Sequence, residues 1–504
     1  MMAPEKINYE TSLKQLLMGF CEITSAINVT GVAIDSRKVE PGNLFIAYKG
    51  SFDNGLNYLG EAIEKGAVAI VIDDNEEFDI ESFSSKIFKV TELRKSAGHI
   101  ISRFYGHPSR NINIVGVTGT NGKTTVSYIL GFANHKLKKN SAFIGTLGLG
   151  LFGQIEASKT TTPDPVTIHS SLSTWENEVD SVAMEVSSHA LDQGRVEGVE
   201  FDTAVFTNLS RDHLDYHKTT ENYIKAKFSL FEKAGLKNAV INISDSYGAQ
   251  LIEKIPEDVN VFAYSCKKSN LKFYKREDIS FTYCEKVEIE SFKSKLIKIN
   301  SPWGNANVRV NLLGDFNLEN ILAAFTVLCI SGQPVDEVAK VLSSFSGLPG
   351  RMEAFYLKGK PLIVVDYAHT PDALKKALTS LSPYCNGELF CIFGCGGGRD
   401  IGKRAQMGSI AESLCDQIIL TNDNPRDESS DKIFEDILEG IENKSNVIIK
   451  PDRSDALITT FLEAKKGDVI LLAGKGHEVT QQIGLNMFPF SDRELAKRLT
   501  EEHL

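Results

Sequence analysis

Apolar positions along this chain form short runs that alternate with longer segments of helical periodicity. Between residues 112 and 345 this alternation is typical of βαβ units and a mostly parallel sheet. The strand-like runs are residues 114–117, 142–144, 182–186, 203–207 and 239–243. The first 110 residues repeat the pattern on a smaller scale, and a further series of strands and helices begins after residue 360. We therefore expect an α/β protein built on mostly parallel sheets.

Glycine and proline mark two breaks in this pattern. Gly106, Pro108 and Ser109 precede the apolar run that starts at Ile112, and the sequence GLPG occupies residues 347–350. These breaks predict three domains, at residues 1–110, 111–345 and 346–504, and the last of them is predicted to be Rossmann-like. Within the central domain, alternating residues from 272 to 310 predict an antiparallel ribbon. A length of 504 residues agrees with about three domains.

Composition and charge narrow the classes of partner. The chain has 55 Lys and Arg against 66 Asp and Glu, a formal net charge of −11, so nucleic acid is a disfavoured partner. No run approaches the ~18 apolar residues of a membrane helix, and the first ten residues lack the pattern of a signal peptide. The eight cysteines contain no CxxC pair, which favours free thiols. We expect a cytoplasmic, monomeric protein that binds small molecules and no membrane.

The most specific motif is a glycine-rich loop between a buried strand and a helix, NIVGVTGTNGKTT at residues 113–125. The backbone N–H groups of such a loop can surround a phosphate, while Lys123 neutralises charge and the Thr124 hydroxyl ligates Mg²⁺. A turn with a solvated lysine is the alternative, but strand, loop and helix occur in the order that a P-loop-type central domain requires. The predicted ATP-binding residues in this loop are Gly119, Thr120, Asn121, Gly122, Lys123, Thr124 and Thr125.

Two other glycine-rich segments resemble a dinucleotide site less well. Residues 148–153 fit GxGxxG, but QIEASKTTTPDP follows and cannot open a helix soon. Residues 394–399, GCGGGR, lack the last glycine of that pattern. NAD is therefore weakly supported.

Polar residues follow two further strands of the central domain. VAMEVSSHAL, residues 182–191, places Glu185 at a strand end, and TNLSRDHLDYH, residues 207–217, places His213 after the next strand. A carboxylate at such an edge suits a hard cation that bridges nucleotide phosphates. Taken alone, Glu185 is better explained as a solvated residue, and part of the second segment as a helix cap.

The string TGTNGKTT resembles the ATP loop of the Mur ligase family, the ATP-dependent amide ligases of peptidoglycan precursor synthesis and their folylpolyglutamate synthase relatives. Its short glycine spacing, with Val117 where an ordinary P-loop has glycine, fits that family. At least seven motifs between Asp35 and Asp492 follow in the family's order, so the resemblance covers all three predicted domains.

The resemblance implies a magnesium site. Glu185 and His213 match the family's Mg²⁺ ligands, beside the Thr124 hydroxyl. ENYIKAKFSLF, residues 221–231, resembles the segment whose lysine is carbamylated, and the match falls on Lys227 rather than on Lys225. The carbamate, formed from CO₂, would supply two oxygens that bridge or orient Mg²⁺. Lys123, Lys227 and His213 are the catalytic residues that the resemblance implies.

Further matches concern the nucleotide. GDFNLENILAAF, residues 314–325, predicts an amphipathic helix in which Asn320 matches an adenine contact. Arg351, Asp366 and His369 match residues that close over ATP, with Asp366 placed for the ribose hydroxyls. By themselves these residues would be explained by capping and packing.

The sequence DNPR at residues 423–426 resembles the motif by which diaminopimelate-adding members recognise their amino acid. Without that context it is an ordinary turn. The chemistry agrees, because Arg426 would pair with a far carboxylate that lysine lacks. The implied amino-acid-binding residues are Arg399, Asp423, Asn424, Pro425, Arg426, Gly474 and Glu478. Gly398 and Ala405 depart from the family pattern, which usually has Asp and Pro there.

The resemblance also implies a site for a UDP-sugar peptide. DSR at residues 35–37 resembles a uridine-binding segment, and TTTPDP at residues 160–165 resembles a segment that holds the muramyl peptide. The implied residues are Ser36, Thr160, Thr161, Thr162, Ser187 and Arg195. As bare sequence they are a turn and a capped loop.

Taken together, the resemblance implies an ATP- and Mg²⁺-dependent amide ligase. It would add meso-diaminopimelate to the D-glutamate of UDP-N-acetylmuramoyl-L-alanyl-D-glutamate through an acyl phosphate. The nearest alternatives are a lysine-adding ligase of the same type and a folylpolyglutamate synthase-like ligase. From another class, a P-loop switch or motor ATPase would hydrolyse nucleotide without an acceptor.

Overall fold

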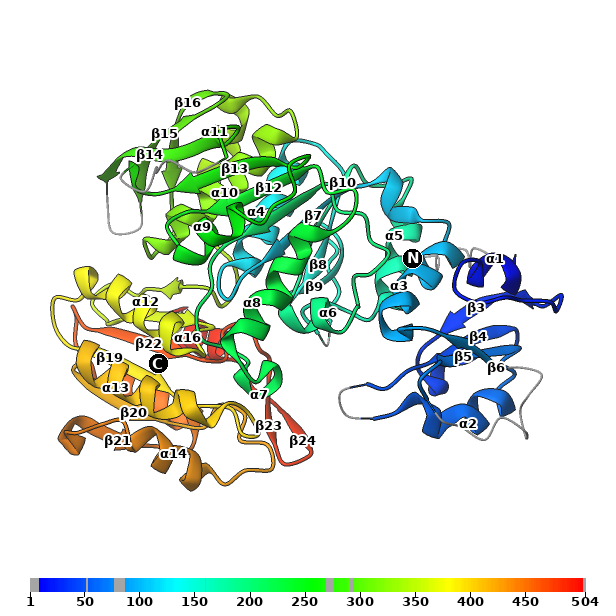
Figure 1. Cartoon of the computed structure of the whole chain (residues 1–504). Helices are drawn as coiled ribbons and strands as arrows, with labels where there is room; N and C mark the ends of the chain where they lie inside the picture. Colours follow the sequence, from blue (N-terminus) through cyan, green and yellow to red (C-terminus); the bar gives the residue numbers. More distant parts are fainter. Residues whose placement is uncertain are drawn as a thin grey trace. The chain divides into compact units, whose positions relative to one another are not determined.

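The computed structural model describes residues 9–50, 53–76, 87–158, 160–268, 276–290 and 294–501. The chain divides into two compact units, and Figure 1 gives the labels of their helices and strands. The first unit comprises the described residues of Met1–Thr118, Lys138–Ala204 and Ala226–Asn238, and the second comprises those of Gly119–Leu137, Val205–Lys225 and Ala239–Leu504. The boundary falls within strands β11 and β12 and helix α8, so each unit is described by itself.

The amino-terminal part of the first unit is a parallel sheet with helices on both faces. The sheet has the order β3-β4-β5-β6, with β3 at Gly31–Ala33, β4 at Asn43–Ala47, β5 at Ala69–Asp73 and β6 at Ile87–Val90. The helices are α1 (Leu13–Leu17), α2 (Leu59–Glu64) and α3 (Leu93–Phe104). Because side chains alternate along a strand, Leu44 and Ile46 pack towards α1 and α3, whereas Phe45 packs towards α2. A short antiparallel pair, β1 (Thr11–Ser12) and β2 (Asn28–Val29), precedes this sheet.

The remainder of the first unit contains strands in the order β7-β10-β8-β9. Strands β7 (Asn113–Thr118), β10 (Ser181–Glu185) and β8 (Ser141–Gly145) are parallel, and β9 (Gly148–Leu151) is antiparallel to β8. Helices α5 (Pro165–Trp175) and α6 (Ser188–Asp192) belong to the same part. Residues 148–151 are therefore a strand, which agrees with rejecting the GxGxxG match there.

The second unit begins its strand order with β11-β12-β13-β14-β15-β16. The strands are β11 (Thr203–Phe206), β12 (Asn238–Asn242), β13 (Asn260–Ser265), β14 (Ser280–Ile289), β15 (Lys295–Ser301) and β16 (Gly304–Val310). The helices are α4 (Lys123–Lys136), α7 (Leu214–His217), α8 (Thr220–Phe228), α9 (Ser246–Ile252), α10 (Phe316–Ile330) and α11 (Val335–Ser343). Strands β14, β15 and β16 are antiparallel, so the predicted ribbon is confirmed, although residues 272–275 and 291–293 lie outside the described residues.

Helix α10 differs from its prediction. Nearly every residue from Asn317 to Cys329 is buried, so the helix is not amphipathic. Apolar side chains surround it on all sides, and its polar residues Asn317 and Asn320 are buried as well.

The last part of the second unit is a mostly parallel sheet in the order β17-β18-β22-β19-β20-β21. The parallel strands are β18 (Leu362–Asp366), β22 (Val469–Ala473), β19 (Leu389–Phe393), β20 (Gln417–Leu420) and β21 (Val447–Ile449), and β17 (Glu353–Phe355) is antiparallel. Helices α12 (Pro371–Leu381), α13 (Arg404–Leu414) and α14 (Ser430–Leu438) cover one face (Figure 1). Helices α15 (Arg453–Glu463) and α16 (Asp492–Glu501) cover the other. Helices on both faces agree with the Rossmann-like prediction.

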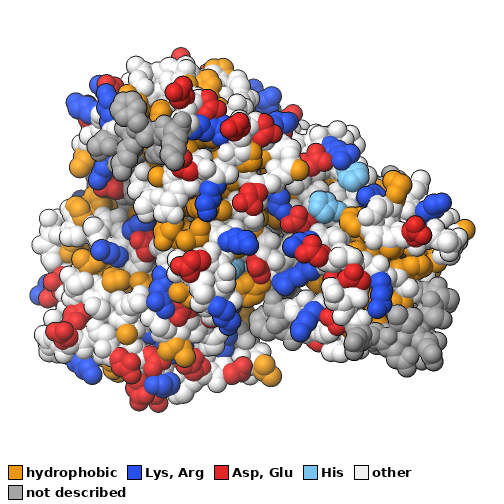
Figure 2. Space-filling view, viewed as in Figure 1, with side chains coloured by type: hydrophobic (Ala, Val, Ile, Leu, Met, Phe, Trp, Pro, Cys, Tyr) orange, Lys and Arg blue, Asp and Glu red, His pale blue; other side chains and the backbone are white. Residues whose placement is uncertain are grey.

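A hairpin of β23 (Thr480–Ile483) and β24 (Asn486–Pro489) precedes α16. Figure 2 shows acidic and basic side chains interspersed over the face that it draws. Among the described helices, none is long and apolar enough to cross a membrane, and all eight cysteines are free. The α/β fold class with mostly parallel sheets is confirmed, and the three domain boundaries stay predictions.

Candidate functional site

The glycine-rich loop leaves no room for side chains at two of its positions. Gly119 and Gly122 have positive φ angles of 148° and 87°. A Cβ atom at Gly119 would lie 1.9 Å from Thr207 Oγ1, and one at Gly122 would lie 2.6 Å from Asn320 Oδ1. Only glycine fits such a backbone at such a distance. Asn320 therefore lies directly against the loop, although an adenine contact for it stays a prediction.

The segment that follows β11 holds this loop through backbone groups. Thr120 N donates to Asn208 O at 2.8 Å, and Asn121 N donates to Asn208 Oδ1 at 3.0 Å. Thr207 Oγ1 in turn donates to Asn121 O at 2.6 Å. Ser210 N donates to Thr120 Oγ1 at 2.9 Å. Residues 207–210 therefore fix the loop conformation, a role that the sequence motif did not reveal.

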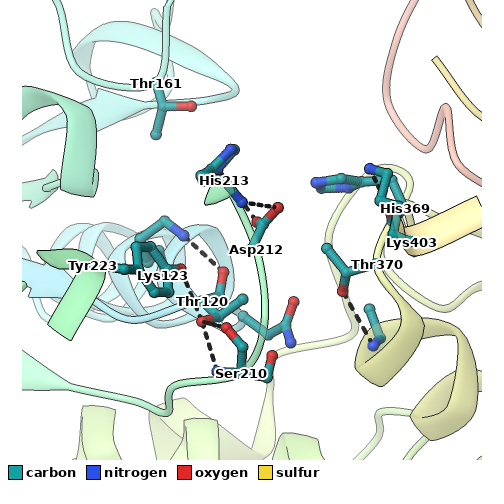
Figure 3. Close-up of polar contacts among 12 residues, drawn as sticks. Thr120, Lys123, Thr161, Ser210, Asp212, His213, Tyr223, His369, Thr370 and Lys403 are labelled. Carbon is teal, nitrogen blue, oxygen red and sulfur yellow. Dashed lines mark hydrogen bonds and ion pairs between the residues drawn. The ribbon is translucent and has the colours of Figure 1, made fainter. Parts of the chain in front are cut away.

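Lys123 begins α4 and points back over the loop, where its amine donates to the carbonyls of Gly119 and Thr120 at 2.8 Å each (Figure 3). The amine is thus held at the helix N-terminus, where a phosphate is favoured by both the charge and the helix dipole. This geometry agrees with phosphate binding by Lys123.

Asp212 is a buried carboxylate beside this lysine, and sequence reasoning gave it no role. Burial raises its pKa, but four positively charged or protonatable groups outweigh burial and lower the pKa to about 2. These groups are His213, His369, Lys403 and Lys123. The ring of His213 lies with Nε2 3.3 Å from Asp212 Oδ2 (Figure 3). Asp212 therefore stays ionised and balances a locally cationic site.

Arg351 reaches the same loop from the segment before β17. Its Nη2 donates to Thr124 Oγ1 at 3.1 Å, and its guanidinium lies 4.3 Å from the centre of the Tyr367 ring. Its Nε is buried without a hydrogen-bond partner among the described residues, which suits an anion. Asp366 ends β18 and accepts from Met352 N at 2.8 Å, and burial raises its pKa while Arg351 lowers it.

His369 lies two residues beyond Tyr367, and its Nδ1 is 2.8 Å from the Tyr367 carbonyl. Lys403 Nζ donates to the His369 carbonyl at 2.7 Å (Figure 3). Burial, followed by the charge of Lys403, lowers the pKa of His369 to about 4, so its ring is neutral at pH 7. Because Lys403 is largely buried beside Asp212, it is a second cation of the site that sequence reasoning missed.

The residues predicted to bind the amino acid follow the carboxyl ends of parallel strands. Arg399 follows β19, Asp423 follows β20, and Gly474 directly follows β22. Since these ends share one edge of the sheet, the fold brings the three segments together. Gly474 has a φ of 113°, and a Cβ atom there would lie 2.4 Å from Asp423 Oδ2, which explains the glycine.

Arg426 is held in a left-handed backbone conformation, with a φ of 54°. The hairpin fixes it there, because Arg426 N donates to Gln482 O at 3.2 Å and Gly484 N donates to Arg426 O at 2.8 Å. Its guanidinium donates to the Gly397 carbonyl at 2.9 Å. Burial, followed by the charge of Arg399, lowers its pKa. Within the described part of the chain, neither arginine forms an ion pair with an acidic side chain.

The side chain of Asn424 is engaged by neighbours in the protein. It donates to Glu478 Oε2 at 2.9 Å and accepts from Lys475 Nζ at 3.1 Å and from Gln482 N at 2.9 Å. Burial raises the pKa of Asp423, and the nearby Lys475 lowers it. Acidic and basic groups thus lie together around residues 423–426. Lys475 was not among the predicted residues.

Arg404, which was also not among the predicted residues, supports the loop that carries Arg399. Arg404 is fully buried and makes two hydrogen bonds to Glu428, at 2.6 and 2.7 Å, and one to Asp436 at 2.8 Å. Glu428 also accepts from Gly398 N at 3.0 Å. Gly398 has a φ of 63° with open space around it, so glycine suits this departure from the family pattern. The structure gives no account of Ala405.

In the first unit, Glu185 ends β10 fully buried. It accepts from Thr146 N at 2.7 Å through Oε1 and from Thr146 Oγ1 at 3.1 Å through Oε2. Thr161 Oγ1 lies 3.1 Å from the same Thr146 hydroxyl, and Thr162 Oγ1 donates to the Glu185 carbonyl at 2.8 Å. The predicted threonines are thus gathered around Glu185.

Ser187 and Arg195 complete this group. Ser187 N donates to Thr162 Oγ1 at 3.1 Å, and Arg195 Nη1 donates to the Thr162 carbonyl at 2.9 Å. Thr160 precedes them in the chain and accepts from Ser158 Oγ at 2.9 Å through its carbonyl. Ser36 is buried and donates to Glu61 Oε2 at 2.6 Å. Among the described contacts, none joins Ser36 to the threonine group.

Lys227 lies on α8 and is 1% exposed, whereas Lys225 on the same helix is exposed. Two positions along a helix correspond to roughly 200°, so the two lysines point in opposite directions. The two lysines therefore lie in different environments, and the one that matches the family's carbamylated residue is the buried one.

The predicted metal ligands pass a test of chemistry. No group of three or more His, Cys, Asp or Glu side chains in the described ranges is arranged to hold a metal ion. Mg²⁺, however, commonly takes only one or two protein carboxylates and completes its coordination with substrate phosphates and water. The buried Glu185 carboxylate in the first unit and the Thr124 hydroxyl in the second are each oxygen donors of that kind. Each of these two groups therefore suits Mg²⁺ by its chemistry.

Comparison with protein families decides the assignment. The model described as Mur ligase family, catalytic domain matches residues 28–105, the Mur ligase middle domain matches residues 117–328, and the Mur ligase, glutamate ligase domain matches residues 350–476. The chain belongs to the Mur ligase family. The predicted family and the predicted ligase activity are thereby confirmed.

This Mur ligase is similar to curated relatives along nearly its whole length. It is 41% identical over 479 residues to UDP-N-acetylmuramoyl-L-alanyl-D-glutamate--2,6-diaminopimelate ligase of Coxiella burnetii, a match that covers 94% of this chain and 96% of the relative. The protein of the same name from Pseudomonas aeruginosa is 41% identical over 488 residues, 97% of each chain.

Solved structures agree. A structure of UDP-N-acetylmuramoyl-L-alanyl-D-glutamate--2,6-diaminopimelate ligase has a TM-score of 0.69 at 31% identity and covers 97% of this chain and 99% of that one. The MurF ligase from Thermotoga maritima in complex with ADP has a TM-score of 0.59 at 20% identity, over 88% and 94% of the two chains, and shares the fold. The roles of individual site residues in this Mur ligase stay predictions.

Proposed function

We propose that this Mur ligase joins meso-diaminopimelate to the D-glutamate of UDP-N-acetylmuramoyl-L-alanyl-D-glutamate, at the expense of ATP. The relatives that share 41% of its residues carry the name of that reaction, apart from the stereochemistry of diaminopimelate. The protein would act as a monomer in peptidoglycan precursor synthesis. It would do so in the cytoplasm, where ATP and the UDP-sugar are available.

The charged groups around Arg426 support diaminopimelate as the amino acid. Arg426 lies within electrostatic reach of Arg399, Asp423 and Glu478. Diaminopimelate ends in a carboxylate and an ammonium, so such a set of two guanidiniums and two carboxylates complements both charges. Lysine would leave the guanidiniums unpaired, which penalises it.

The chemistry begins with phosphoryl transfer. An oxygen of the D-glutamate γ-carboxylate attacks the γ-phosphorus of ATP, the bond to the β-phosphate oxygen breaks, and ADP leaves. Lys123 and Arg351, both of which contact the glycine-rich loop, would stabilise the charge that moves during this step. Mg²⁺, held by Thr124, Glu185 and His213, would neutralise phosphate charge when bound.

Amide formation follows from the acyl phosphate. The neutral amine of diaminopimelate attacks the activated carbonyl, the tetrahedral intermediate expels phosphate, and the amine proton is lost to solvent or phosphate. Asp366 and His369 would hold the ribose side of the nucleotide during these steps, and Asn320 the adenine. Asp366 ends β18 and His369 follows it, so both lie at the sheet edge. Asn320 lies against the glycine-rich loop.

Lys227 is proposed to carry a carbamate. Its Nζ forms a bond to the carbon of CO₂ and releases one proton, which converts a cation into an anion with two oxygens. Only a neutral amine reacts in this way. The buried position of Lys227 supports the choice of this lysine over the exposed Lys225 on the same helix. The carbamate would bridge or orient Mg²⁺.

The UDP-sugar peptide is proposed to bind in the first unit. Thr161, Thr162 and Ser187 carry hydroxyl groups that lie close together, and Thr160 precedes them in the chain. Arg195, which donates to the Thr162 carbonyl, would supply a positive charge for a carboxylate or phosphate. Ser36 would contact the uridine from a separate element, the 3-10 helix Ser36–Lys38.

A single assay tests the proposed function. Purified protein is supplied with ATP, Mg²⁺ and the UDP-muramyl dipeptide, with either meso-diaminopimelate or L-lysine, and phosphate and product mass are followed. Phosphate release and a tripeptide product with diaminopimelate are expected. Preference for lysine would identify a lysine-adding ligase, and phosphate release without the dipeptide would identify an ATPase.

A further inference from the structure

Lys475 is a lysine with no exposed surface in the middle of the proposed amino-acid site. Its Nζ donates to Glu478 Oε2 at 2.8 Å and to Asn424 Oδ1 at 3.1 Å. It is also close enough to Asp423 to affect that carboxyl. Lysines are rarely buried unless they are paired with an acidic group. Lys475 is paired in this way with Glu478, and the two charges depend on each other.

The contacts of Lys475 occupy part of Glu478. Oxygen Oε2 accepts from both Lys475 Nζ and Asn424 Nδ2, while Glu478 as a whole remains partly exposed. The charge of Glu478 is therefore already matched within the protein. The far ammonium of an incoming amino acid would therefore approach a Glu478 carboxylate that is already paired with Lys475.

We propose that Lys475 is a positioning residue that sets amino-acid specificity by balancing the charge of Glu478. Through this balance the site depends on the far carboxylate of the incoming amino acid more than on its far ammonium. This inference rests on the proposed function, because it concerns the choice between diaminopimelate and amino acids that carry only one of those two groups.

Diaminopimelate and lysine bring different charges to the site, and this difference sets the expected change in preference. Diaminopimelate brings a carboxylate to Arg399 and Arg426 together with an ammonium to Glu478, so every charge finds a partner. Lysine brings the ammonium alone, which leaves the two guanidiniums unpaired and adds a fourth cation to Arg399, Arg426 and Lys475. Removal of the Lys475 charge would reduce the repulsion of the far ammonium, which both amino acids carry, and would also reduce the attraction of the far carboxylate, which only diaminopimelate carries. The preference for diaminopimelate over lysine should therefore fall.

The test compares Lys475→Gln with Lys466→Gln, which removes an exposed lysine outside the site. The expected result is a fall of about tenfold in the ratio of kcat/KM for diaminopimelate to kcat/KM for lysine, with the KM values for ATP and the UDP-muramyl dipeptide unchanged. Lys475→Arg, which keeps the charge, should retain the ratio of the wild type. Equal losses with both amino acids would show a merely structural role and overturn the proposal.

A measurement on the wild-type protein guards against a variant that does not fold. 2-Aminoheptanedioate has the far carboxylate without the far ammonium, so it should be a better substrate than lysine. The reverse order would overturn the inference even if diaminopimelate is used well, and the proposed function would then stand. Failure of the wild type to use diaminopimelate would overturn both.

Discussion

Replacement of Arg453 by methionine tests how the sheet edge that carries the amino-acid site is stabilised. Arg453 and Asp492 are both 0% exposed, and Nε and Nη2 of the arginine each donate to the carboxylate at 2.8 Å. Nη2 also donates to the carbonyl of Ala473, the last residue of β22, at 2.9 Å. Arg453→Met would leave the Asp492 carboxylate buried without its partner.

Breaking such a pair costs about 3–5 kcal/mol, because the remaining charge is uncompensated. Asp492 begins α16, and the helix dipole offsets up to about 1 kcal/mol of that cost, so we expect a loss near 3 kcal/mol. For a domain of this size each kcal/mol lowers the midpoint of thermal unfolding by roughly 2–4 °C, so the expected shift is roughly 6–12 °C.

Calorimetry and denaturant titration would measure the effect. The control is Lys497→Met, which removes a pair with Glu501 whose side chains are 55% and 64% exposed, and which should cost less than about 1 kcal/mol. The double variant Arg453→Met with Asp492→Leu should recover part of the loss, because no charge is left buried. A cost for Arg453→Met as small as that of the control would refute the reasoning.

Three further predictions concern activity and pH. Lys227→Ala should lower kcat on the order of 100-fold, with part of the rate restored by a short carboxylate in the buffer, while Lys225→Ala leaves it unchanged; full activity of Lys227→Ala would exclude the carbamate. Arg426→Asn should lower kcat/KM for diaminopimelate on the order of 100-fold, and unchanged steady-state kinetics would remove Arg426 from the site. The lowered pKa of Asp212 means that its charge stabilises the folded state above its ordinary pKa of 3.8 and that this contribution is lost as the pH falls from about 4 towards 2. Asp212→Asn should reduce the dependence of the thermal unfolding midpoint on pH over that window. An unaltered profile of midpoint against pH would contradict this account.

The fold was largely predictable because parallel strands are buried on both faces and appear as continuous apolar runs. The run at residues 114–117 lies within β7, and residues 182–186 overlap β10. Strand β9, which alternates glycine with half-buried leucine, and the hairpin of β23 and β24, whose residues are half-buried or exposed, carry no such run and were not predicted. The periodicity of α10 failed for the opposite reason, because apolar side chains surround it entirely.

The site residues were predictable where they lie close together in the sequence and form one motif. In the glycine-rich loop, the residues that would bind phosphate are neighbours along the chain. Arg404 pairs with Glu428, 24 residues later, so no local pattern indicates its role. Lys475 contacts both Asn424, 51 residues earlier, and Glu478, three residues later. A signal for Lys475 did exist, because it lies between two residues already assigned to the amino-acid site, Gly474 and Glu478.

The left-handed backbone of Arg426 has a consequence for how substrate preference can change over generations. Asparagine, aspartate and glycine adopt that conformation more readily than arginine does. A single codon change at residue 426 can therefore exchange the recognising side chain while the hairpin keeps its hydrogen bonds to the same main-chain atoms. The backbone around residue 426 therefore does not depend on which side chain this residue carries. Substitutions there can change the amino-acid preference with little loss of folding stability.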